Sequence, residues 1–423
     1  MKFKMQDQQN QRIARISSSH LIIGVDIAQH HHVARAVNYR GIAFGKPLAF
    51  ENNEEGFTRL LDRIAAWKEA SGCTTEIVGM EPTGHYWLNL TAWLKGRQID
   101  VVTVNPHLVK KNKENRDHTQ SKSDAKDALV IADMVKNGYY SQIHPTSETF
   151  DSLRVLMANR EVLVKRRVAT INQLHRWVDI VFPELREVFQ DLQSKGAIAT
   201  LRLFPMPKQL RELDVADVIH GWKTGMKRHA GHRKAETLLA VAKRSVGSTQ
   251  APEAYLLHLD QLLEEWDLVT AQLERVEHEV AATLEHVTYR HSFLAIDGIS
   301  DLSLAGILGE AGDIRGFAHG NALLRHAGLH LAEASSGKWK GQVVLSKRGR
   351  SRLRRCLYLA TLSLIKNNAD FRHLHHVNVQ GKKMKKMKSV MKLMGKLARI
   401  LVALARGGEP YCSEKVRPLP SAV

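Results

Sequence analysis

Two aspartates three residues apart, Asp124 and Asp127, have the spacing in this chain that best suits metal chemistry. They lie in a stretch, residues 121–137, that we expect to be helical, so both carboxylates should project from one face. Neighbouring anions repel unless a cation lies between them, and a hard divalent cation with oxygen ligands is the usual partner. Because Asp-x-x-Asp is also common on solvated helices, the motif alone leaves an ordinary acidic surface as the alternative.

Two more acids stand at the ends of expected strands. Asp26 lies near the end of the apolar run 21–27, and Glu81 ends the buried run 76–81. A helix at 57–70 and a strand at 100–104 continue an alternating pattern that predicts an α/β domain. In such a domain, acids at strand ends gather at one edge of the sheet.

Together the four carboxylates have the layout that holds two divalent metal ions about 4 Å apart. One ion would activate the attacking oxygen of a phosphodiester reaction, and the other would stabilise the leaving oxygen. Each acid by itself is also compatible with a helix cap or a loop anchor. A basic loop that suits a phosphate backbone lies between Glu81 and Asp124. Its cations are Lys110, Lys111, Lys113 and Arg116.

The middle of the chain has the pattern of long helices. Apolar residues follow a three-and-four spacing over 150–181, interrupted at Arg160 and Arg167, and a cleaner heptad series covers 259–280. An intramolecular helical hairpin and a dimer-forming coiled coil explain these patterns equally well. Residues 196–250 are helical in character and indicate no function.

The last third contains two further candidate motifs. Residues 296–300 are a near match to a helix-hairpin-helix turn, which grips phosphates through backbone N–H groups, although Ser300 stands where a second glycine is usual. Farther on, Ser336 precedes Gly337 among cations that could depress the pKa of a hydroxyl and neutralise a phosphate under attack. These cations are Lys338, Lys340, Lys347, Arg348, Arg354 and Arg355.

Nearly all of the net charge of +19 lies in residues 338–406, which contain nineteen Lys or Arg and one acid, Asp370. This density indicates a polyanionic partner, nucleic acid first and an anionic membrane second. Within it, we expect a basic amphipathic helix at 381–396 that binds nucleic acid rather than lipid, because the chain also carries the acidic cluster. Its cations include Lys382, Lys383, Lys385 and Lys386, interleaved with methionines.

The rest of the composition indicates a soluble, intracellular protein. Three widely spaced cysteines form neither a disulfide framework nor a zinc pattern. No apolar run approaches the ~20 residues needed to span a bilayer, and the polar residues 1–19 lack the apolar core of a signal peptide. A length of 423 residues suggests two or three domains.

In this order, the motifs resemble the DEDD transposases of the "one-ten" group of bacterial insertion sequences, which include recombinases guided by a bridge RNA. The N-terminal motifs are Gly24-Val25-Asp26, Glu81-Pro82-Thr83-Gly84, Asn105-Pro106 and Lys122-Ser123-Asp124-Ala125-Lys126-Asp127-Ala128. The C-terminal motifs are Gly298 to Asp313, Ala327-Gly328-Leu329, Ser336-Gly337 and Ser346-Lys347-Arg348-Gly349 with Leu353-Arg354.

The resemblance implies an α/β plus all-α fold. After a flexible N-terminus at 1–19, an RNase H-like (RuvC-like) domain would span 20–147 and a helical coiled-coil region 148–290. A mostly helical C-terminal transposase domain with a helix-hairpin-helix-like turn would span 291–408, followed by a tail at 409–423.

The resemblance also implies a division of chemical labour. Asp26, Glu81, Asp124 and Asp127 would hold one or two Mg²⁺ ions, and Ser336 would attack a DNA phosphodiester and form a transient phosphoserine link. Its neighbour Ser335 remains the alternative nucleophile. A structured noncoding guide (bridge) RNA would pair with donor and target double-stranded DNA, leaving the protein, a dimer or tetramer in the bacterial cytoplasm near the nucleoid, to grip backbones.

Two rival functions follow from the same residues. A RuvC-like, structure-specific DNA nuclease using metal-activated water would need the four acids but not Ser336. A non-catalytic nucleic-acid-binding protein would use the C-terminal charge and keep the acids as structural groups. The variants Ser336→Ala and Asp124→Asn separate these hypotheses from a serine recombinase.

Overall fold

The computed structural model describes residues 2–82, 84–112, 123–143, 147–226, 231–332, 335–336, 339–341, 343–407 and 411–413. The chain divides into two compact units, residues 1–145 (unit 1) and residues 146–423 (unit 2). None of the helices in the described ranges is both long and apolar enough to cross a membrane. Each unit is described by itself below.

Unit 1 is built on one mixed sheet, which in the described residues has six strands in the order β3-β2-β1-β4-β5-β6. The central strands β1, β4 and β5 are parallel, and β2, β3 and β6 pair antiparallel with their neighbours. This arrangement confirms the predicted α/β class and is compatible with an RNase H-like fold. The strands are β1 (His20–Asp26), β2 (His31–Asn38), β3 (Ala43–Glu51), β4 (Thr75–Met80), β5 (Asp100–Val104) and β6 (Tyr140–Gln142).

Helices cover both faces of this sheet because alternate residues of β1 point to opposite sides. Leu21 and Ile23 pack against α2 (Glu54–Ser71) and α3 (Trp87–Gly96) on one face. Ile22 packs on the other face against α5 (Asp124–Lys136), beside the short helix α4 (Pro106–Asn112). Strands buried on both faces explain the continuous apolar runs in the sequence.

The N-terminal residues, expected to be flexible, form helix α1 (Lys2–Arg15). Its last turn is fixed to the sheet: the Tyr140 hydroxyl donates to the Arg12 carbonyl at 3.3 Å, and Arg15 forms an ion pair with Asp100 at 2.7 Å. The partly buried Ile16 adds an apolar contact. These contacts involve residues far away in the sequence, which local polarity does not reveal.

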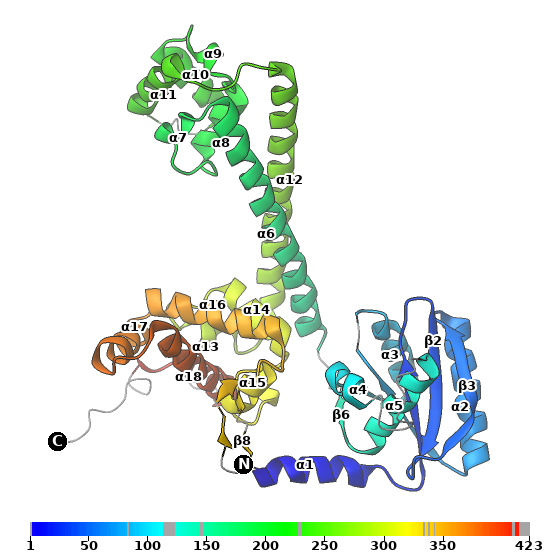
Figure 1. The fold of residues 1–423 in the computed structure, drawn as a ribbon. Helices are drawn as coiled ribbons and strands as arrows, with labels where there is room; N and C mark the ends of the chain where they lie inside the picture. The colour runs from blue at the N-terminus through cyan, green and yellow to red at the C-terminus, as the bar shows by residue number, and fades with distance from the viewer. Residues whose placement is uncertain are drawn as a thin grey trace, which may run out of the picture. The chain divides into compact units, whose positions relative to one another are not determined.

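Unit 2 contains a long helical hairpin, which Figure 1 shows as two helices lying side by side. These are α6 (Glu148–Val181) and α12 (Pro252–Glu285). Two contacts show that they run antiparallel: Arg160, near the start of α6, pairs with Glu277, near the end of α12, and Trp177, near the end of α6, donates to the Tyr255 carbonyl, near the start of α12. The two heptad series therefore pack on each other within one chain. Arg160 interrupts the apolar seam, and its guanidinium lies 2.7 Å from a Glu277 oxygen across the hairpin.

The distal end of the hairpin carries a small helical cap around its own core. Trp177 and Trp222 are fully buried there, and the Trp222 indole N–H donates to Thr200 at 2.9 Å. The helices are α7 (Leu185–Val188), α8 (Lys195–Leu203), α9 (Pro207–Leu210), α10 (Val215–Gly225) and α11 (His232–Arg244). Residues 196–250 thus contribute a packed element rather than a linker.

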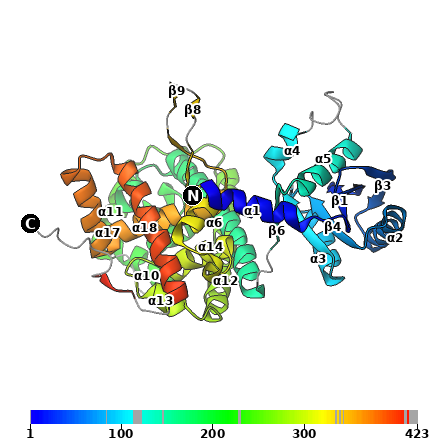
Figure 2. The ribbon, with the colours of Figure 1, turned by 90° about the horizontal axis from the view of Figure 1, so that it is seen from below.

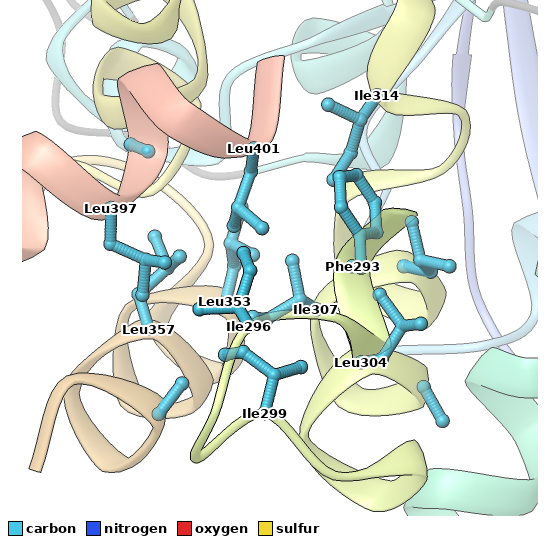
Figure 3. Close-up of a cluster of buried hydrophobic side chains, with 14 of the residues drawn as sticks. Phe293, Ile296, Ile299, Leu304, Ile307, Ile314, Leu353, Leu357, Leu397 and Leu401 are labelled. Atoms are coloured by element: carbon cyan, nitrogen blue, oxygen red, sulfur yellow. The ribbon is translucent and has the colours of Figure 1, made fainter. Parts of the chain in front are cut away.

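The proximal end of the hairpin shares a hydrophobic core with the C-terminal helices. Leu153 and Val280 belong to the same cluster as the buried side chains in Figure 3, among them Phe293, Leu353 and Leu401. The helices are α13 (Arg290–Leu294), α14 (Asp301–Ala311), η1 (Ile314–Gly316), α15 (Gly320–His326), α16 (Ser351–Asn367), α17 (Ala369–His376), the π-helix η2 (Val377–Gly381) and α18 (Lys386–Gly407). The domain boundary expected at residue 291 falls inside this core.

The basic amphipathic helix expected at 381–396 begins later, at Lys386, and extends to Gly407 as α18. Its apolar face is part of the core, since Val390 and Met394 are only 5% and 1% exposed. Lys382, Lys383, Lys385 and Lys386 are exposed before and at its start. A partner can therefore use the cations of this segment but not its buried apolar stripe.

Candidate active site

Asp26 and Glu81 lie at the ends of neighbouring parallel strands. Asp26 is the last residue of β1, and Glu81 directly follows β4. The register pairs Val25 with Met80, so the two acids occupy the next level of adjacent strands. Both side chains are half-buried. The edge of the sheet predicted to collect strand-end acids does bring these two together.

Two glycines show which face of the sheet α5 covers, and this is the face on which the acids lie. A Cβ atom on Gly24 would lie 2.0 Å from the Ala128 carbonyl oxygen, and one on Gly79 would lie 2.4 Å from a Val135 methyl group. Helix α5 therefore crosses β1 and β4 in direct contact with their backbones. Because residues two apart in a strand share a face, Asp26 and Glu81 belong to the face that α5 covers.

Helix α5 begins at the same edge. Ser123 caps it, with its hydroxyl oxygen accepting from the Lys126 N–H at 3.2 Å. Asp124 and Asp127 lie in the first turn, where the helix dipole favours negative charge. Asp124 is exposed and Asp127 is 5% exposed. Since Ala128 lies on Gly24, only two residues from Asp26, the first turn of α5 adjoins the strand ends.

The donor set at this edge consists of carboxylates, which are the hard oxygen ligands that Mg²⁺ takes from proteins. Within the parts of the chain that the structure describes, no three His, Cys, Asp or Glu side chains are grouped closely enough to hold a metal ion. The four predicted acids therefore match magnesium in chemical type and lie near one edge of the sheet, but their described side chains are not gathered into a metal-binding group.

Ser335 and Ser336 form β8, the first strand of a narrow two-stranded hairpin in unit 2. Ser336 pairs with Trp339 of β9 (Trp339–Lys340), and Ser335 pairs with Lys340. Figure 2 shows this hairpin projecting away from the helices of unit 2. The backbone therefore places both candidate serines on one strand of this protruding ribbon.

The base of this ribbon is held by a ladder of backbone bonds. Strand β7 (Leu331–Ala332) pairs with β10 (Val344–Leu345), and the Lys347 N–H donates to the Gly328 carbonyl at 2.9 Å. Gly349 packs against Gly328 so closely that a Cβ would lie 2.3 Å from the Gly328 nitrogen. Arg354 connects both sides by donating to the carbonyls of Ala327 at 2.8 Å and Lys347 at 3.4 Å. These contacts tie the base of the serine-bearing ribbon to α16.

Two family models match the chain. Residues 23–183 match a transposase model that carries the DEDD designation, and residues 290–376 match the model described as the transposase IS116/IS110/IS902 family. The chain belongs to this transposase family. Transposases cut and rejoin DNA, so DNA is a substrate of the chain.

Individual relatives agree with this assignment. The IS117 mini-circle protein of Streptomyces coelicolor is 25% identical over 74% of this chain and 77% of its own length. The 44.8 kDa protein of insertion element IS116 from Streptomyces clavuligerus is 23% identical over 91% of this chain and 94% of its own. The 42 kDa protein of IS900 from Mycobacterium paratuberculosis is 24% identical over 69% and 73%.

The predicted nucleic-acid ligands of this transposase fall into three groups. Lys110, Lys111, Lys347 and Arg348 are exposed, as are the four lysines at 382–386. Arg354 and Arg355 make internal contacts, the first with the ribbon base and the second with Glu161 at 2.8 Å. Lys113, Arg116 and Lys338 lie outside the described residues, and Lys340 is described only as a backbone position of β9. Exposed cations thus remain in both units.

The helix-hairpin-helix prediction gives the correct elements. Helices α13 and α14 flank a turn with Gly298 at φ +96°, and Ser300 caps α14 by accepting from the Ser303 N–H. The turn packs against α16, where the Ser363 hydroxyl donates to the Gly298 carbonyl at 2.8 Å. This side of the turn is therefore used for internal packing.

Two positioning features were missed by the sequence reasoning. Gly24 and Gly79 set the height of α5 over the acids, and their sequence signal is a glycine inside an apolar strand, which often marks close backbone approach. Arg354 was assigned to nucleic acid, but its guanidinium holds the ribbon base. The sequence alone does not show whether an arginine in a basic stretch binds nucleic acid or makes hydrogen bonds within the protein.

Proposed function

We propose that this transposase cuts and rejoins DNA with Asp26, Glu81, Asp124 and Asp127 as magnesium ligands and Ser336 as the nucleophile. The observation that supports the proposal is that α5, with two aspartates in its first turn, begins beside the end of β1, next to the end of the neighbouring strand β4. The capped start of α5 and the burial of Asp127 also support a defined position for this first turn.

In the proposed reaction, the Ser336 hydroxyl oxygen forms a bond to phosphorus while a deoxyribose oxygen leaves. Serine loses its proton, and the leaving oxygen gains one, so a phosphoserine link replaces the DNA phosphodiester. Bound Mg²⁺ would stabilise the negative charge that develops on these oxygens. The later attack of a deoxyribose hydroxyl on the phosphoserine reverses the step and rejoins the strand without an external energy source.

The remaining parts of the proposal concern partners. A structured RNA encoded by the same element would choose donor and target by base pairing, while exposed Lys and Arg hold backbones. The net charge of +19 supports a large polyanionic assembly. A dimer or tetramer is proposed because recombination acts on two DNA duplexes.

A covalent-adduct assay tests the proposal. The full chain, expressed with the noncoding DNA that flanks its gene, is mixed with end-labelled junction and target DNA and Mg²⁺, then run on a denaturing gel. We expect label at protein mass for wild type and Ser335→Ala, and none for Ser336→Ala or Asp124→Asn. Free cleaved fragments that persist in Ser336→Ala would instead establish a metal-dependent nuclease. Salt-sensitive DNA binding without any cleavage would favour the non-catalytic hypothesis.

A further inference from the structure

A polar cavity of about 360 Å³ lies in unit 1 beside the C-terminal end of α5. Its lining includes Lys136, the last residue of α5, whereas the aspartates lie in the first turn. Lys136 follows Asp127 by nine positions along the helix, which corresponds to about 14 Å. The cavity is therefore a separate feature from the carboxylate edge.

The groups that line this cavity have three complementary kinds of chemistry. Arg40 and Lys136 are cations suited to phosphate, and Asn112 and Asn137 are amides that can both donate and accept hydrogen bonds. Tyr139 offers an aromatic ring that is 47% exposed. Asp133, 3.7 Å from Lys136, offsets part of the positive charge. Cation, amide and exposed ring together are what unpaired nucleotides bind.

Local backbone structure holds these groups in place. Arg40 lies in the turn between β2 and β3, where the Asn38 side-chain oxygen accepts from the N–H groups of Arg40 and Ile42, both at 3.0 Å. Gly41 has φ +91°, and a Cβ there would lie 2.7 Å from the Lys136 ammonium nitrogen. The turn and the end of α5 are thus packed against each other, which preforms the cationic side of the cavity.

The aromatic side is equally constrained. Gly138, at φ +73°, ends the turn after α5, and the Tyr139 N–H donates to the Met134 carbonyl at 2.9 Å. The next residue, Tyr140, is 2% exposed and begins β6. Successive side chains at a strand start point to opposite faces, so burial of Tyr140 directs the Tyr139 ring outward.

Further cations lie near the cavity. Lys110 and Lys111 are exposed on the last turn of α4, immediately before Asn112. Arg12 of α1 adjoins the turn, since a Cβ on Gly138 would lie 3.4 Å from the Arg12 Cβ. A nucleic-acid strand that places one nucleotide in the cavity would therefore find further positive charge nearby.

We propose that this cavity binds an unpaired nucleotide of a single strand, with its base stacked on Tyr139, its base edge at Asn112 and Asn137, and its phosphate at Arg40 and Lys136. A paired base does not fit this role, because its faces are stacked on neighbours and its edge is occupied. The proposal rests on the proposed function, in which a guide RNA or a DNA strand displaced by it supplies the unpaired segment.

The test measures binding of the full-length chain by fluorescence polarisation. The probes are a fluorescein-labelled single-stranded RNA of mixed sequence, a DNA of the same sequence, and the corresponding DNA duplex. The variants are Tyr139→Ala, Tyr139→Phe and Arg40→Ala. Lys46→Ala is the matched control, because Lys46 is an exposed cation on β3 outside the cavity. Thermal melts of each variant establish that unit 1 is folded.

We expect Tyr139→Ala to weaken single-strand binding roughly tenfold, as for loss of one stacked base, and Tyr139→Phe to preserve it. Arg40→Ala should weaken binding and reduce the salt slope by about one ion, while Lys46→Ala and duplex binding stay near wild type. Weaker binding of the single-stranded RNA alone identifies the guide RNA as the source of the bound nucleotide. Weaker binding of both the single-stranded RNA and the single-stranded DNA means that displaced DNA also binds in the cavity. Equal binding by wild type and Tyr139→Ala, or equal losses on duplex, would overturn the proposal.

This outcome is independent of the serine chemistry. Binding needs neither Mg²⁺ nor Ser336, so the same measurements on Ser336→Ala should give wild-type affinities. Loss of the covalent adduct with intact Tyr139 dependence would remove the serine mechanism and leave the cavity assignment in place. Normal adduct formation together with binding that does not depend on Tyr139 would retain the serine mechanism and remove the cavity assignment.

Discussion

The substitution Gly24→Ala should damage the acidic edge without touching an acidic residue. The new Cβ would lie 2.0 Å from the Ala128 carbonyl oxygen and 2.5 Å from the Ala132 nitrogen. Both are backbone atoms of α5, so no side-chain rotation can relieve the clash. Ordinary van der Waals contact requires about 3.4 Å, so the helix has to move by roughly 1 Å or more away from β1.

Two consequences with different magnitudes follow. Overpacking of this kind costs about 1–3 kcal/mol, which lowers the melting temperature of a unit of this size by about 3–10 °C. The same movement shifts Asp124 and Asp127 relative to Asp26, and a misplacement of about 1 Å in a catalytic constellation can reduce the rate ~100-fold. We therefore expect strand cleavage to fall much further than stability.

The assay is the rate of strand cleavage at a temperature where the variant is folded, together with its thermal melt. Gly96→Ala is the matched control, because a Cβ atom added to Gly96 would have no neighbour within 4 Å and the φ of this glycine is not positive. It should leave stability and cleavage near wild type. Wild-type cleavage by Gly24→Ala, or a loss no larger than that of Gly96→Ala, would refute the assigned position of α5.

Three other predictions follow. Asp124→Asn and Asp127→Asn should each abolish Mg²⁺-dependent cleavage in a gel assay, while only the buried Asp127 position should change the melting temperature appreciably. Burial opposes ionisation of Asp313, but hydrogen bonds from Arg315 and Tyr289 lower its pKa. Because Asp313 and Arg315 are partly exposed to screening solvent, Asp313→Asn should cost about 1 kcal/mol in denaturant titrations above about pH 4, and progressively less below it. Burial and the nearby Arg350 lower the pKa of His326, so the folded state disfavours its protonation; acidification from about pH 7.5 to 5.5 should destabilise wild type more than His326→Gln.

Much of unit 1 could be predicted because its signals are local. Buried parallel strands appear as continuous apolar runs, and Asp26 and Glu81 stand at the points where those runs end. The order of the sheet then places the two acids side by side. What local signals did not show was the close crossing of α5 at Gly24, which depends on a backbone more than 100 residues away in the chain.

For the helices, the sequence predicted where each helix lies but not which helix it packs against. A heptad pattern states that a helix has an apolar seam but not which helix covers it, so the packing of α6 on α12 needed the structure. The methionines near α18 predicted an amphipathic surface, yet Met394 is buried in the core while Met387 is 56% exposed. Periodicity identifies a face, and only tertiary packing decides what it meets.

The cations illustrate a third limit. Arg348 and Arg354 have the same side chain and lie six residues apart, but Arg348 is exposed while Arg354 joins two carbonyls at the ribbon base. The cavity at Tyr139 likewise draws its residues from the β2–β3 turn, α4 and α5. No strand end or motif marks these residues as the strand ends mark Asp26 and Glu81, so the sequence alone does not indicate that they line one cavity.

The most direct test of the serine mechanism is to identify the amino acid joined to DNA. The adduct formed by the full chain with junction DNA and Mg²⁺ is digested with protease and nuclease, and the nucleotide-bearing peptide is sequenced by mass spectrometry. The account predicts a nucleotide phosphate on Ser336 and no such peptide from Asp124→Asn. A nucleotide on Ser335 or on any other residue, or cleavage with no DNA-linked peptide, would contradict it.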